Sequence, residues 1–160
     1  MENVEKLNEI KEKAEEYYKS IGDIYCPYLK RNVSFNAKGL DHIKFKEWEK
    51  ARLASDQYLR LKFIKVTPEV IGNTNTLQEY KETRCFERQK INSRWEQRMV
   101  DVKYYGFVAI IKKTRVKIIV KEIVGGNPYF WSVIPFWKSR KNPIVGQIKK
   151  IFHEGDLETQ

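Results

Sequence analysis

The segment 102–138 constrains the fold more than any other, because three β-branched and aromatic runs follow one another there with only turn residues between them. The runs are 104–111, 116–123 and 129–137, separated by a basic turn at 112–115 and by a Gly-Gly-Asn-Pro turn at 125–128. Runs of this length and composition, bounded by turn residues, are typical of antiparallel strands. The sequence therefore predicts an antiparallel meander with no helix between its strands.

The middle run, 116–123, indicates how the two faces of the sheet differ. Side chains alternate across a strand, so Val116, Ile118 and Val120 point to one face. Lys117 and Lys121 flank Ile119 on the other face. We predict that the first face is core and that the second is wet and positive, either as a platform for a polyanion or simply as a solvated surface.

Helical patterns dominate the chain before this sheet. An amphipathic helix is predicted over 2–20, ended by Gly22, with an apolar seam that can pack on the domain or pair with a second copy. The seam residues are Val4, Leu7, Ala14, Tyr18 and Ile21. Further helices are predicted over 40–54, 55–65 and 68–71, and strands near 33–35 and over 77–86.

These elements predict an α+β fold in which N-terminal helices pack on an antiparallel sheet of about four strands. At 160 residues one domain is expected, with a helix at 1–22, an α+β domain at 23–152 and a frayed tail at 153–160.

Charge and hydropathy limit the possible partners. The net charge is +10, which attracts phosphate polymers or acidic proteins. The charged N-terminus is unlike a signal peptide, and the longest apolar stretch, 129–137, is too short to span a bilayer. We expect a cytoplasmic protein with no membrane partner.

Cysteine usage gives little reason to expect a metal. Cys26 and Cys85 are the only cysteines, and no CxxC or HxxxH pair brings ligands together. A site made from both cysteines with His42 and His153 is conceivable, but two reduced structural thiols fit these separations better. No metal and no cofactor are predicted.

A basic loop is predicted to follow the strand 77–86, and it is the most interesting polar part of the chain. Its charged and aromatic residues are Glu87, Arg88, Lys90, Arg94, Trp95, Glu96 and Arg98. Guanidinium groups bind phosphate and rings stack on bases, so this composition favours nucleic acid. A salt-bridged surface loop is the alternative.

His42 is predicted to lie off the packed face of the helix 40–54. At about 100° per residue, Leu40, Ile43 and Trp48 share one face, and His42 and Lys46 share the opposite one. Histidine is well suited to proton transfer near neutral pH, and a lysine one turn away favours its neutral form. A solvated surface histidine is the other interpretation.

Two short motifs resemble those of the barnase/EndoU/colicin/RelE-like superfamily of small ribonucleases, in its phage-associated branches. They are Gly39-Leu40-Asp41-His42-Ile43 at a helix start and Trp131-Ser132 in the final strand, and the resemblance covers about 33–138. It implies metal-independent RNA cleavage of the toxin-like type, in which a base activates the ribose 2′-hydroxyl. The branches in question often carry more histidine than this chain, so a binding-only descendant also fits.

The resemblance assigns roles to individual residues. His42 would be the base or acid, Arg88, Lys90 and Arg94 the phosphate clamp, and Ser132 a hydrogen-bonding partner. Arg52 and Glu96 are secondary candidates, and further RNA contacts are expected from Lys46, Arg52, Lys90, Trp95, Lys117, Lys121 and Trp131. The partner is then RNA, with a protein inhibitor or homodimer as further possibilities. The competing functions are a non-catalytic nucleic-acid-binding module and a protein-interaction factor that acts as an inhibitor or assembly partner.

Overall fold

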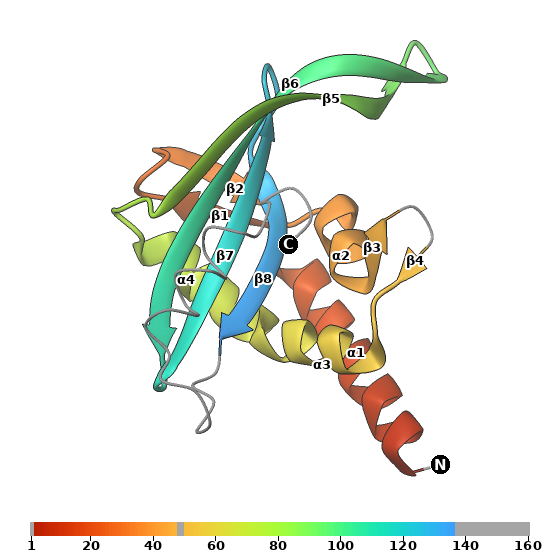
Figure 1. Ribbon diagram of the computed structural model, residues 1–160, viewed down its shortest axis with the longest axis vertical. Coiled ribbons are helices and arrows are strands. Elements are labelled where there is room, and N and C mark those ends of the chain that lie inside the picture. The colour runs from red at the N-terminus through yellow and green to blue at the C-terminus, as the bar shows by residue number, and fades with distance from the viewer. Residues whose placement is uncertain (1, 48–49, 137–160) are drawn as a thin grey trace.

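The computed structural model describes residues 2–47 and 50–136 (Figure 1). The predicted tail 153–160, with His153, lies outside these residues. The elements are α1 (Glu2–Ile21), β1 (Asp23–Cys26), β2 (Arg31–Ser34), α2 (Ala37–Lys44), β3 (Phe45–Glu47), β4 (Lys50–Ala51), α3 (Ala54–Phe63), the 3-10 turn η1 (Ile64–Val66), α4 (Thr67–Asn73), β5 (Glu79–Ile91), β6 (Arg94–Ile111), β7 (Thr114–Ile123) and β8 (Tyr129–Phe136).

The described strands form one large sheet and one small one. The large sheet has the order β1-β2-β8-β7-β6-β5 and is antiparallel except between β2 and β8, while β3 and β4 form a separate pair. No helix interrupts the run from β6 to β8. The α+β class and the antiparallel meander predicted from 102–138 are thereby confirmed.

The helices pack on one face of this sheet, which holds the main core. Tyr18 of α1, Ile43 of α2 and Leu61 of α3 meet Phe107 and Phe130 of the strands in one cluster. Val116, Ile118 and Val120 are fully buried in it, as the alternation predicted. Because Ala14 and Tyr18 of the predicted seam pack here, that part of α1 belongs to the domain core.

The second face of the sheet is not the wet, positive surface that was expected. Lys117 and Lys121 are buried together with Ile119. The reason is that β5 brings carboxylates onto them: Lys117 Nζ lies 3.2 Å from Glu79 Oε2, and Lys121 Nζ is paired with Glu87 Oε1. Burial lowers the pKa of Lys117, and Glu79 opposes this shift. Neither lysine is therefore available to a polyanion in this arrangement.

The predicted helix 40–54 is also wrong beyond its first residues. The helix α2 ends at Lys44, and Phe45 takes extended backbone angles. The chain then turns back through β3 and β4, and the Arg52 amide donates to the Lys44 carbonyl at 2.9 Å. Helical spacing therefore does not apply past residue 44.

The predicted basic loop is instead part of two long strands. β5 runs from Glu79 to Ile91 and β6 begins at Arg94, so the segment 87–98 is nearly all strand. The turn residues Asn92 and Ser93 both have positive φ, at 48° and 65°, as a two-residue hairpin of the primed type requires. The alternating exposed and half-buried pattern of β5 is that of a strand with two unequal faces.

A glycine sets the distance between α2 and β8. A Cβ on Gly39 would lie 2.2 Å from the Phe130 carbonyl oxygen and 2.7 Å from Tyr18 Oη. Only a residue without a side chain allows this helix to approach the strand so closely, and His42 of the same helix depends on that approach.

We predict that Gly39→Ala lowers the free energy of unfolding by about 1–3 kcal/mol, because backbone must move to admit the methyl group. The matched control is Gly72→Ala in α4, where the added Cβ would meet only Ile24 Cγ2 at 3.6 Å. The control should be neutral or slightly stabilising, since alanine favours a helix. Urea unfolding of both variants measures the difference, and equal stabilities would contradict the tight contact.

Candidate functional site

The edge of β8 is where the first group of predicted site residues meets. β8 pairs with β7 along its length but with β2 only at Tyr129, and α2 and α3 lie beside the rest of this edge (Figure 1). The pairing with β7 shifts between Ile119 and Val120, which leaves Trp131 as an extra residue in a bulge. A bulge re-aims the side chains around it, here those of Trp131 and Ser132.

His42 stacks on Trp131 and is buried, contrary to the expected exposed position. The ring centroids are 4.0 Å apart with planes 17° from parallel, and His42 is 7% exposed. Arg52 holds the histidine from the other side: its Nε donates to the His42 carbonyl at 3.0 Å, and its Nη2 lies 3.2 Å from His42 Nε2. A guanidinium can only donate, so Nε2 accepts and the imidazole is neutral with its proton on Nδ1.

Arg60 joins this group from α3. Its Nη1 donates to Ser132 Oγ at 2.6 Å and its Nε to Asp56 Oδ1 at 2.9 Å. Asp56 Oδ2 lies 3.5 Å from Arg52 Nη1, so two buried guanidiniums share one carboxylate. Burial and the charge of Arg60 lower the pKa of Arg52 to about 10. The two guanidinium groups therefore have only one carboxylate, that of Asp56, between them in this group of residues.

Arg60 was not among the site residues predicted from the sequence. The signal that could have found it is the pair Asp56 and Arg60, four residues apart on one helix. Such pairs are common on exposed surfaces, so the spacing alone would not have singled it out.

Lys121 also contacts Trp131 and completes the group. Its Nζ lies 4.2 Å from the Trp131 ring centroid and 5.6 Å from that of Tyr104. The structure thus brings five of the predicted residues together around β8, in the order Arg52, His42, Trp131 and Lys121, with Ser132 joined through Arg60. The Tyr129 hydroxyl lies buried beside these residues. Burial raises the pKa of Tyr129, and the nearby Glu87 and Cys85 raise it further.

The second group of predicted residues lies on a two-stranded ribbon that projects from the sheet. β6 pairs with β7 only as far as Val102, so residues 84–101 of β5 and β6 continue as a hairpin arm (Figure 1). We call this segment the ribbon. Residues directly opposite each other on paired strands share a face, so the register assigns each side chain to one of two ribbon faces.

One ribbon face combines rings with cations, and we call it the aromatic face. Its cross-strand pairs are Phe86 with Met99, Arg88 with Gln97 and Lys90 with Trp95. Arg88 Cζ lies 5.0 Å from the Trp95 ring centroid, a cation–π contact. The apolar side chains are open to solvent, with Phe86 68%, Trp95 59% and Met99 49% exposed.

The opposite ribbon face carries the remaining charges. Its pairs are Ile91 with Arg94, Gln89 with Glu96 and Glu87 with Arg98. Arg94 and Glu96 therefore point away from Arg88 and Lys90, and the expected clamp of Arg88, Lys90 and Arg94 is divided between two faces. Lys46 belongs to β3, and its side chain lies outside the described residues.

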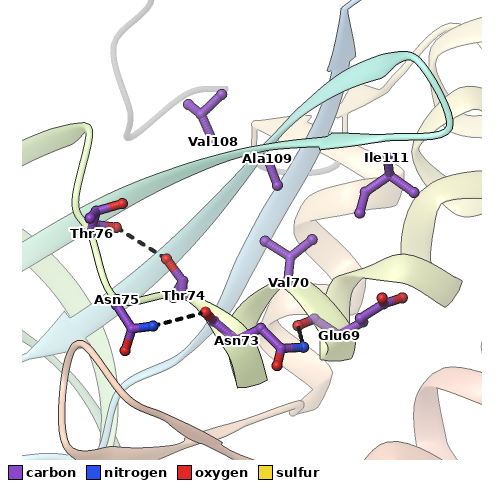
Figure 2. Close-up of a pocket in the computed structure, with 9 residues that line it drawn as sticks. All are labelled: Glu69, Val70, Asn73, Thr74, Asn75, Thr76, Val108, Ala109 and Ile111. Carbon is purple, nitrogen blue, oxygen red and sulfur yellow. Dashed lines mark hydrogen bonds between the residues drawn. The ribbon is translucent and has the colours of Figure 1, made fainter.

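An open cavity of about 670 Å³ lies between α4 and β6 and contains none of the predicted site residues. Figure 2 shows Val70, Ala109 and Ile111 on one side and the loop 74–76 on the other. The loop's polar groups bond to backbone close by, for example Thr74 Oγ1 to the Thr76 carbonyl at 3.1 Å. The cavity has no convergent polar groups that identify a ligand.

The described residues offer no metal centre: within 2–47 and 50–136, no three His, Cys, Asp or Glu side chains gather where they could hold an ion. None of the helices in this part of the chain is both long enough and apolar enough to cross a membrane. Comparison with protein-family models, with curated proteins and with solved structures found no match. The resemblance to small ribonucleases therefore stays a prediction from the two motifs that carry it.

The buried pair of Lys121 and Glu87 predicts a measurable stability difference. Glu87→Gln should lower the free energy of unfolding by about 2–3 kcal/mol, because it leaves the ammonium of Lys121 without a counter-charge under the ribbon. Glu96→Gln, at an exposed position of the paired strand β6, removes the same charge and should change stability by less than about 0.5 kcal/mol. Denaturant unfolding near neutral pH compares the two, and equal losses would contradict the assigned pairing.

Proposed function

We propose that the protein is an RNA-binding module and that the aromatic face of the ribbon makes the main contact with a single strand. The observation that carries this proposal is the mixture of exposed rings and cations on one face, with Arg88 over Trp95 and Lys90 directly opposite it. Single strands are bound by such surfaces, because bases stack on rings while cations follow the phosphates.

The charge of the whole chain supports the same partner. A net charge of +10 speeds encounter with a polyanion at moderate salt. Since Lys117 and Lys121 are neutralised by Glu79 and Glu87, the ribbon is a better contact surface than the sheet. An acidic protein is the competing partner for the same face. The salt dependence of binding and the contribution of the aromatic rings to affinity distinguish RNA from such a protein.

We predict that Arg88→Ala and Lys90→Ala each weaken RNA binding and reduce the slope of log K against log salt by about one unit, as the loss of one phosphate contact requires. Trp95→Ala should weaken binding about 5- to 150-fold with little change in slope, because it removes stacking of about 1–3 kcal/mol. Fluorescence anisotropy with a labelled single-stranded oligonucleotide at several salt concentrations measures both quantities.

Arg98→Ala is the matched control, since it removes the same charge from the same ribbon on the opposite face. It should change the affinity much less than Arg88→Ala does. Equal effects of the two variants would mean that charge alone attracts RNA, and unchanged binding by all four variants would remove the ribbon as the binding surface. Comparison of RNA with DNA of the same sequence tests whether the 2′-hydroxyl matters.

A second candidate function is metal-independent RNA cleavage at the β8 edge, favoured by the hydrogen-bonded group of His42, Arg52, Arg60 and Ser132. In this proposal a substrate phosphate draws Arg52 away from His42 Nε2, which then accepts the proton of the ribose 2′-hydroxyl. The 2′-oxygen attacks phosphorus and the 5′-oxygen leaves with a proton from solvent. Arg52 and Arg60 stabilise the charge that develops on the phosphate.

Cleavage by this route should fall about 10²- to 10⁴-fold in His42→Gln, which retains an acceptor for Arg52 but cannot take up a proton. The substrate is a single-stranded RNA, assayed with a chelator present, beside the same oligonucleotide with one 2′-deoxy linkage. That linkage should resist cleavage. Equal rates in parent and variant, or no cleavage by a parent protein that binds the RNA, would leave the binding module as the function.

A further inference from the structure

The strand β5 forms an unusually long edge of the sheet. It has 13 residues, and within the described part of the chain it pairs only with β6. Over 84–91 it also belongs to the ribbon, where β6 has no third strand beyond it. An edge of this length presents a row of backbone donors and acceptors to which another strand can add.

A two-stranded ribbon is marginally stable alone, and three or more strands are generally needed for independent stability. The ribbon has few buried side chains of its own, since every residue from Asn92 to Met99 is exposed. A further strand along β5 would therefore stabilise it.

We propose that a second copy of this chain supplies that strand, with the two β5 strands antiparallel about a two-fold axis at Cys85. The occupant is identified by charge complementarity along β5. In this register Glu82 faces Arg88 of the second copy, Tyr80 faces its Lys90 and Arg84 faces its Phe86, and symmetry repeats each pair. All of these side chains lie on one face, so a carboxylate meets a guanidinium and a cation meets a ring.

Two neighbouring registers would also keep matching side chains on the same face of the sheet, but they place like charges opposite each other. An axis at Arg84 places that residue opposite itself, and an axis at Phe86 places Arg84 opposite Arg88 of the second copy. Like charges directly opposite each other destabilise a sheet. On the other face the axis at Cys85 pairs Thr83 with Glu87 and brings the two Cys85 side chains together, with no like-charged pair.

In this dimer the ribbon of each copy lies along the sheet edge of the other. Residues 84–91 of one copy would lie along 79–86 of the other, so each projecting ribbon gains the sheet edge of its neighbour. The two aromatic faces then lie on the same side of one continuous sheet. This association does not depend on RNA binding, and the two proposals can fail separately.

Cys85 on the axis allows a direct test with the whole chain and no RNA. A short bis-maleimide, or mild oxidation, should link two copies through Cys85, and Cys85→Ser should abolish the link. Cys26 is fully buried and is not expected to react in the folded protein. Sedimentation equilibrium at tens of micromolar protein gives the mass independently of any reagent.

Charge reversal then tests the register. Glu82→Arg and Arg88→Glu should each weaken dimerisation at least tenfold, and the double variant should recover most of the loss, because the pair is restored with its signs exchanged. A monomeric parent protein, a dimer that is not linked at Cys85, or a double variant no better than the single ones would overturn the proposal. A dimer through α1 would survive Glu82→Arg and would overturn it as well.

Discussion

One buried lysine connects the parts of this molecule that carry its candidate functions. Lys121 of β7 is paired with Glu87, at the base of the ribbon, and lies over the ring of Trp131, on which His42 stacks. A lysine is buried at acceptable cost only when its charge is paired. The ammonium group thus contacts β5 through Glu87 and β8 through Trp131, and α2 reaches the same indole ring through His42.

This arrangement divides the basic residues into two sets with different roles. Lys117, Lys121, Arg52 and Arg60 are buried and serve packing and internal pairing, with an excess of positive charge only around Asp56. Arg88 and Lys90 lie on an exposed strand face beside rings, and within 2–47 and 50–136 neither is paired with a buried carboxylate. The net charge of +10 does not show which basic residues belong to which set. The register of β5 with β6 shows that Arg88 and Lys90 share one face of the ribbon.

The fold was predictable from the sequence where a pattern was local. The three runs in 102–138 and the helix that ends at Gly22 needed only alternation, helical spacing and turn residues. The burial of Lys117 and Lys121 was not predictable, because it depends on two glutamates at least 34 residues away. His42 was expected to be open to solvent because a regular helix was extended to 54, whereas the chain returns through β4 and Arg52 covers the histidine. The association of His42, Ser132 and Trp131 was suggested by motif resemblance and not by spacing.

We propose that the aromatic face of the ribbon is the RNA contact. Amide and side-chain NMR signals, followed while a short single-stranded RNA is added, show which residues RNA touches. Saturable shifts are expected at Phe86, Arg88, Lys90, Trp95 and Met99, including the indole signal of Trp95, with much smaller changes at Arg94 and Arg98 on the opposite face. Shifts that are confined to other surfaces, or spread evenly over all basic residues, would contradict it.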